Sequence, residues 1–341
     1  MKELTERRQA ILAMVVREYI DSARSVGSKT IVERYNLGIS SATMRNEMAY
    51  LEERGYLTHF HTSAGRVPTE KGYRYFVERL MQEAELPLVE QRMISHQFHQ
   101  LHLELDQWMR LAAAVLAHTA RSAALVTAPR ASRCCFKHLE LISIRGPMVL
   151  LILILQGGIV KEQMLTLAQP LSQDDLSRTS NWLNELFGGL DTSQITAQLP
   201  RLSLSEAQIA ELVVELMERT DEGRGSDIYR DGLINILRQP EFTEVENVRQ
   251  LIRVLERRGF LEQVLAEASP VNGVQVIIGG EGRWDELSEY SIVLARYGVV
   301  GRAIGTLGVL GPMRMPYRRA ISTVRYVADL LSDLVHELYG C

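Results

Sequence analysis

The spacing of apolar residues over the first 55 positions predicts three helices. Between Leu4 and Tyr19, apolar positions recur every three or four residues with charges on the other side, as in an amphipathic helix. Residues 28–35 are expected to form a second, shorter helix. Ser40 is a suitable N-cap for a third helix, which should run to about Arg54 and stop at the glycine that follows.

An extended pattern follows these helices. Residues 56–59 predict a strand, a turn is expected at Ala64 and Gly65, and residues 66–68 predict the return strand. Thr69 then caps a fourth helix. Helices followed by a two-stranded hairpin are typical of a winged helix-turn-helix, in which the hairpin is the wing.

The middle of the chain changes from helical to extended patterns. Residues 90–126 predict a long helical stretch that ends near Pro129. Three apolar runs joined by tight Gly-Pro and Gly-Gly turns then predict an antiparallel meander. The runs cover residues 136–145, 148–156 and 159–167. Because the middle run is apolar throughout, that strand is expected to be covered on both faces.

Helical periodicity returns between Pro170 and Pro270, and strands resume after it. The helical segments cover residues 174–187, 205–218, 228–237 and 245–268. Strands are expected at residues 274–278, 291–296 and 299–309, before a last helix over residues 317–338. Since strands lie on both sides of the helical block, we predict an α+β protein whose second domain contains a helical insertion. A simple row of three domains is the alternative.

The third helix carries the pattern that predicts function. Met44, Met48 and Leu51 fall on one side of a helical wheel, as core residues do. The opposite side has two alanines beside Arg45 and Asn46, where a solvated helix normally carries more charge. Small residues let a helix lie deep in the major groove of DNA, where Arg can read guanine and Asn can read adenine. An ordinary amphipathic helix in an unrelated bundle is the alternative.

Hydroxyl groups at the start of this helix suit a phosphate, and Arg66 beside the glycine turn gives the hairpin a basic tip. The candidate DNA-binding residues are therefore Ser40, Ser41, Thr43, Arg45, Asn46, Tyr50, His61, Thr62 and Arg66.

Composition refines this interpretation. The 341-residue chain has a net charge of −4, yet its first 80 residues carry 13 basic side chains against 10 acidic ones. The charged N-terminus is no secretory signal, and the longest strictly apolar run, residues 148–155, is too short to cross a bilayer. Vicinal Cys134 and Cys135 are a poor disulfide pair. We expect a cytoplasmic protein without membrane association.

Nothing in the sequence predicts an enzyme, a metal site or a cofactor. The GxSxG and HExxH motifs are missing, and no nucleophile is paired with a base. His96, His99 and His102 share a helix face but lack a further ligand, so surface histidines are favoured over a metal site. The glycine-rich turn at residues 279–282 lacks the spacing of a phosphate-binding loop, so a tight connection is favoured there.

The stretch from Gly38 to Met81 resembles the HrcA family of heat-inducible transcription repressors. Its segments SSATMRNEM, LEERGYL, HTSAGRVPT and GYRYFV have the family's order and spacing. The body has a similar layout, so the resemblance covers the whole chain. Phe60 departs from the pattern, because a proline is expected before the His-Thr-Ser of the wing. This departure loosens the entry to the wing without removing its basic tip.

The resemblance implies a homodimer with a winged helix, a GAF-like domain and a helical insertion that serves dimerisation. It also implies repression of chaperone operons of the DnaK and GroEL type through an inverted-repeat operator called CIRCE, with the GroEL chaperonin supporting the active repressor. The expected boundaries are residues 1–85 for the winged helix, 86–170 with 271–341 for the GAF-like domain, and 171–270 for the insertion.

Two rival interpretations belong to other classes. In the first, the winged helix is gated by a small ligand bound in the GAF-like domain, for which Arg283, Glu286 and Arg302 are the only polar candidates. In the second, an enzyme carries a DNA-binding appendage, which would require a catalytic constellation that the sequence lacks.

Overall fold

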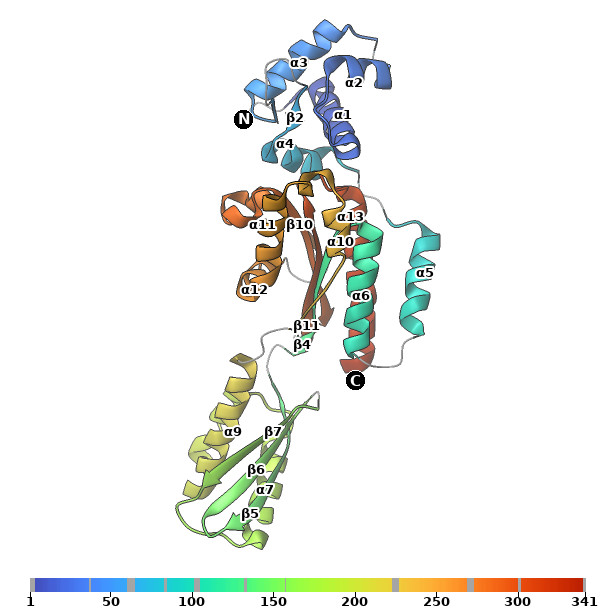
Figure 1. Cartoon of the computed structure of the whole chain (residues 1–341). Coiled ribbons are helices and arrows are strands. Elements are labelled where there is room, and N and C mark those ends of the chain that lie inside the picture. Colours follow the sequence, from blue (N-terminus) through green and yellow to red (C-terminus); the bar gives the residue numbers. More distant parts are fainter. Residues whose placement is uncertain are drawn as a thin grey trace. The chain divides into compact units, whose positions relative to one another are not determined.

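The computed structural model divides the chain into two compact units (Figure 1). The first unit combines residues 1–129 with 227–341, and the second contains residues 130–226. The structure describes the whole chain except residues 1–3, 37, 60–64, 83–84, 101–104, 132–133, 157, 223–226, 269–272, 300–301 and 340–341. Within the first unit we call residues 4–82 the head, and residues 85–129 together with 227–339 the body. Among the described residues, no helix is both long and apolar enough to cross a membrane.

The head has the order of elements that the sequence predicts. Three helices precede a short antiparallel hairpin, in which Leu57 pairs with Pro68 and Thr58 with Val67. Thr69 caps the next helix by accepting a hydrogen bond from the Gly72 amide at 3.1 Å. The elements are α1 (Glu6–Ser22), α2 (Ser28–Tyr35), α3 (Ser41–Glu53), β1 (Leu57–Thr58), β2 (Val67–Pro68), α4 (Glu70–Tyr75) and the π-helical turn η1 (Phe76–Leu80).

The body is built on an antiparallel sheet in which five strands follow one another in the order β8-β3-β11-β10-β9. Its strands are β3 (Ala123–Thr127), β8 (Ile228–Asp231), β9 (Val274–Ile278), β10 (Tyr290–Val299) and β11 (Ala303–Pro312). Its helices are α5 (Leu88–His99), α6 (Leu105–Ala120), α10 (Leu233–Leu237), α11 (Val245–Glu256), α12 (Arg258–Ala266) and α13 (Tyr317–Tyr339). Short 3₁₀ turns lie at η3 (Pro240–Phe242), η4 (Gly279–Gly282) and η5 (Asp285–Leu287).

Helices cover both faces of the body sheet. Alternate residues of a strand point to opposite faces, and the core divides accordingly. Val293 belongs to the cluster that includes α6 and α13, whereas its neighbour Leu294 packs with α11 and α12. Both side chains are fully buried. The sheet is therefore the central layer of the body.

The second unit is a three-stranded meander with helices on one face. Its strands are β5 (Phe136–Arg145), β6 (Met148–Leu155) and β7 (Val160–Thr166), paired in the order β5-β6-β7, and the short β4 (Arg130–Ala131) precedes them. The helices are α7 (Gln173–Phe187), α8 (Thr192–Thr196), the 3₁₀ turn η2 (Leu199–Arg201) and α9 (Leu204–Glu222). Residues of α7 and α9 pack on the buried face of the meander.

The two units differ from the predicted domain boundaries. The sequence places the meander with the GAF-like domain and residues 171–270 in the insertion, because the pattern changes from strand to helix near residue 170. In the structure the meander instead forms one core with the helices that follow it, while residues 227–268 pack on the body sheet. Change of secondary structure and change of domain do not coincide here.

Two shorter predictions were wrong. The helical stretch predicted over residues 90–126 ends at Ala120, where Arg121 takes a left-handed conformation and β3 begins two residues later. The helix predicted over residues 228–237 begins instead with β8, which pairs with β3. In both segments sheet pairing overrides an ambiguous local pattern, as tertiary contacts commonly do.

Two partly buried arginines join the head to the body. Arg314 of the body donates to the carbonyl oxygen of Ile20 at 3.1 Å and pairs with Glu241. Arg74 of the head donates to the carbonyl oxygen of Val276 at 2.9 Å and pairs with Glu281. The glycine-rich turn at residues 279–282 thus faces the head as a tight connection.

Candidate nucleic-acid interface

The apolar side of α3 anchors this helix in the head. Met44, Met48 and Leu51 are fully buried, as the sequence predicts. Ser40 is the N-cap, since its hydroxyl accepts a hydrogen bond from the Thr43 amide at 3.1 Å. The Ser40 and Thr43 hydroxyls also lie 2.9 Å apart. The start and the rotation of α3 are therefore fixed by capping and by packing.

The opposite side of α3 is exposed and carries small or polar residues. Arg45 and Asn46 are exposed and, within the part of the chain that the structure describes, their side chains have neither a hydrogen bond nor an ion pair. Ala42 and Ala49 are exposed beside them, and Ser41 lies at the exposed N-terminus of the helix. The exposed side of α3 thus presents one guanidinium group and one amide group between small side chains.

Tyr50 lies at the edge of this surface and is held by two arginines. The Arg8 guanidinium stacks 3.4 Å from the centre of the Tyr50 ring, and the Arg54 guanidinium lies at 5.1 Å. Arg8 also donates to Glu47 at 2.9 Å. Arg8 and Arg54 are absent from the predicted DNA-binding residues, although the Arg7-Arg8 pair on α1 is a basic signal in the sequence.

Arg66 directly precedes β2, on the loop side of the hairpin. Its backbone forms a two-way bridge with Val26, at 2.8 and 2.9 Å. Its side chain donates to Glu52 at 2.9 Å, and His59 contacts the other oxygen of the same carboxylate. At Gly65 an added Cβ would lie 2.6 Å from the Val26 backbone, so only glycine fits there. His61 and Thr62, predicted at the tip of the wing, lie outside the described residues, as does Phe60.

Glu52 is the acidic residue that both Arg66 and His59 contact. Partial burial raises its pKa, but the hydrogen bonds from His59 and Arg66 outweigh burial and hold the pKa of this carboxyl below its ordinary value. Glu52 therefore stays ionised and joins α3 to the residue after β1 and the residue before β2.

The other candidate sites do not converge. Arg283 pairs with Glu267 and Glu286 with Arg257, each at 2.9 Å on the surface, so they do not form an enclosed polar cluster. His99 contacts the Ser95 carbonyl oxygen through Nδ1, and His102 lies outside the described residues. Within the described residues, no group of three His, Cys, Asp or Glu side chains is arranged to hold a metal ion.

Comparison with known proteins agrees with the sequence resemblance. Residues 106–321 match the family model described as "HrcA protein C terminal domain". The heat-inducible transcription repressor HrcA of Roseiflexus castenholzii is 49% identical, with 99% of this chain and 96% of the relative covered. The repressor of the same name from Herpetosiphon aurantiacus is 50% identical, with 99% and 97% covered.

A solved structure described as a hypothetical protein is similar in fold. Its TM-score is 0.62 at 23% sequence identity, and the match covers 98% of this chain and 99% of the other. The similarity in fold to a crystal structure therefore extends over nearly the whole chain. The family model and the two relatives establish that the chain belongs to the HrcA family of heat-inducible transcription repressors.

Proposed function

We propose that this protein is a winged-helix repressor of chaperone operons of the DnaK and GroEL type, which binds the inverted-repeat CIRCE operator as a homodimer. Its active form is supported by the GroEL chaperonin, and its body is a GAF-like domain. The observation that carries the DNA-binding part is the exposed side of α3, where Arg45 and Asn46 stand between two alanines.

The chemistry of this side fits a major groove. The guanidinium of Arg45 can donate two hydrogen bonds to guanine, and the amide of Asn46 can bond adenine in both directions. Ser40, Ser41 and Thr43 at the N-terminus of the helix are suited to a phosphate, because N–H groups there lack intrahelical partners. Tyr50 acts with Arg8 and Arg54 as one unit at the edge of the interface.

The role of Arg66 in this proposal follows from its ion pair. Because its guanidinium is bonded to Glu52, Arg66 sets the position of the hairpin and leaves a second N–H group for a phosphate. His61 and Thr62 remain proposed contacts of the wing on the basis of sequence alone.

The homodimer is supported by the uncovered face of the second unit. Met148, Leu150, Ile152 and Ile154 alternate along β6 on the face away from the buried row. Ile142 and Met164 lie opposite Leu150 on the two neighbouring strands, and both are exposed. An apolar patch of this kind usually marks an interface.

We place a second copy of the chain on this face. The predicted interface on the helices of residues 171–270 is less suitable, because α7 and α9 direct their apolar sides onto the other face of the meander. A face that packs on its own copy gives two-fold symmetry, which matches an inverted repeat. Two linked heads raise the effective concentration at the second half-site, which matters because the head has only a small basic excess.

The proposal is tested by operator binding of an Asn46→Ala protein, with Arg79→Ala as a control that removes an exposed basic residue of the head outside α3 and the hairpin. Asn46→Ala should lose roughly 1–3 kcal/mol of binding to the inverted repeat and little binding to unrelated DNA. The control should retain discrimination. Equal discrimination by both proteins would refute the assignment.

The chaperonin part has its own experiment. Operator binding and the far-ultraviolet circular dichroism signal are followed together on heating, with and without added chaperonin. We expect DNA release before the helices melt, and a larger competent fraction when chaperonin is present. Release only on complete unfolding, with no effect of chaperonin, would contradict it.

A further inference from the structure

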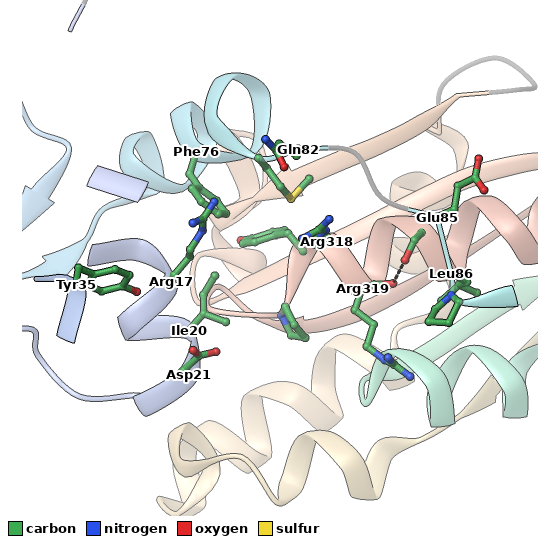
Figure 2. Close-up of a pocket in the computed structure, with 15 residues that line it drawn as sticks. Arg17, Ile20, Asp21, Tyr35, Phe76, Gln82, Glu85, Leu86, Arg318 and Arg319 are labelled. Atoms are coloured by element: carbon green, nitrogen blue, oxygen red, sulfur yellow. Dashed lines mark hydrogen bonds between the residues drawn. The ribbon is translucent and has the colours of Figure 1, made fainter. Parts of the chain in front are cut away.

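A cleft of about 740 Å³ lies between the head and the body (Figure 2). Its lining comes from α1, the end of α2 and η1 of the head, from residues 81–82 and 85–87, and from Pro316 and the start of α13 in the body. None of these residues belongs to the proposed DNA-binding surface on α3. We propose that this cleft is a binding site for a small organic anion, a carboxylate or phosphate attached to an apolar group.

The cationic side of the cleft is formed by Arg17 and Arg318. Neither side chain has an ion pair with any residue that the structure describes. In Figure 2 their guanidinium groups lie beneath Phe76 and Gln82, while Arg319 extends away from them. Arg319 is already bonded to the Thr119 carbonyl oxygen at 2.6 Å and to Glu90 at 2.9 Å. Arg17 and Arg318 are thus the two cations of the lining that remain for a ligand.

The two acidic residues of the lining, Asp21 and Glu85, do not form ion pairs with Arg17 or Arg318. Asp21 lies 4.0 Å from Arg34, which partly balances its charge. Glu85 lies beside Leu86, at the other end of the cleft from Arg17 in Figure 2. The first turn of α13 adds backbone N–H groups without intrahelical partners, at the positive end of a helix of 23 residues. Arginine forks bind carboxylate and phosphate oxygens in pairs, so the charged part of the ligand is an anion of this type.

The remaining walls require an apolar part in the ligand. Ile20, Phe76, Met81 and Pro316 contribute hydrocarbon surface, and Tyr35 and Gln82 add neutral hydrogen-bonding groups. Sites for small molecules commonly combine apolar walls with a few polar groups that set orientation. An inorganic ion would leave these walls uncovered, so an aromatic or aliphatic anion fits better.

Because the cleft lies between the head and the body, a bound anion can link anion binding to operator binding. Arg17 belongs to the head and Arg318 to the body, so an anion held by both restrains the head. If restraint changes operator affinity, operator DNA must change anion affinity by the same factor. This consequence rests on the proposed function, whereas anion binding itself does not.

Calorimetric titration of the full chain without DNA tests the site. The probes are benzoate and phenyl phosphate, with neutral benzamide as the matched control for the ring. We expect saturable binding of at least one anion, with benzamide at least tenfold weaker. The preferred anion distinguishes a carboxylate ligand from a phosphate ligand. Absence of saturable binding by both anions would overturn the proposal.

Variants locate the binding. Arg17→Gln and Arg318→Gln should each weaken the bound anion at least tenfold, whereas Arg92→Gln, an exposed arginine of α5 outside the lining, should leave it unchanged. Arg318→Lys keeps the positive charge but lacks the paired N–H groups of the guanidinium. It replaces Arg318→Gln in this test if that variant does not fold. Wild-type affinity in the variants at both positions would overturn the assignment. A protein that binds the anion but no operator would refute the proposed function alone.

Discussion

Two surfaces differ in kind, and each is left uncovered by the described residues of its own compact unit. The outer side of α3 is small and polar, with two alanines beside Arg45 and Asn46. On the open face of the meander, Leu150 lies between Ile142 and Met164 in an apolar row. In the next row Ile152 lies between Glu140 and Glu162. Both surfaces belong to elements whose other side is firmly buried. The difference indicates a hydrated, hydrogen-bonding partner for the first surface and a dry protein partner for the second.

The largest expected effect tests the meander. Leu150→Asp places a charge at the centre of the proposed dimer interface, and we expect the dimer to weaken by roughly 2–4 kcal/mol, because an unpaired charge cannot be desolvated there. Sedimentation measures the change in association. Leu151→Ala is the matched control on the other face of the same strand, and it should destabilise folding by about 2–5 kcal/mol with no selective loss of association. A Leu150→Asp protein that remains a tight dimer would show that the open face of the meander is not the dimer interface.

The next effect tests why α3 carries alanines. Ala49→Leu adds bulk on the exposed side of the helix, so operator affinity should fall by at least about tenfold, or roughly 1.4 kcal/mol. The free energy of unfolding should change by less than about 0.5 kcal/mol, since the position is exposed. Mobility-shift titration measures the first quantity and chemical denaturation the second. Unchanged affinity would mean that this side of α3 does not approach DNA closely.

A smaller effect is expected at the start of α3. Ser40→Ala removes the hydroxyl that accepts from the Thr43 amide, which should cost about 1 kcal/mol of stability. Ser41→Ala, at the next and exposed position, should leave stability nearly unchanged. If operator binding falls for both variants while stability falls only for the first, both hydroxyls contact DNA and only that of Ser40 also caps the helix. Unchanged operator binding for both variants would contradict the phosphate contact.

The smallest effect is pH dependent. The pKa of Glu52 in the folded protein is lowered, so its contribution to stability is fully present above the ordinary pKa of about 4.5 and is lost as pH falls through the lowered pKa. The wild-type protein should therefore be more stable than Glu52→Gln near neutral pH, and the gap should narrow below about pH 4. Denaturation at a series of pH values checks this. A gap that persists at low pH would show that ionisation of Glu52 is not its source.

Sequence alone predicted the structure best where local periodicity and packing agree. The buried side of α3, its cap at Ser40 and the bounds of β5 and β9 follow from patterns within single segments. The stacking of Arg8 on Tyr50 and the pairing of Arg66 with Glu52 join residues far apart in the chain, so periodicity contains no signal for them.

The meander shows a different limit of sequence reasoning. Its continuous apolar run over β6 predicts two covered faces, but the described structure covers one. A hydrophobic pattern predicts that a surface is buried, but it does not indicate whether the same chain or another chain covers that surface. For the same reason the boundary near residue 170 was placed by a change of pattern, whereas the core is shared across it.

The bridge between Val26 and Arg66, with Gly65 pressed against it, has a consequence for recombination between relatives. The hairpin does not fold independently of the rest of the head, because backbone hydrogen bonds join Arg66 to Val26 in the loop between α1 and α2. A chimera that imports a foreign hairpin should therefore import the segment around residues 23–27 as well. Crossover points placed between these two segments should yield poorly folded heads, whereas crossovers that keep them together should be tolerated.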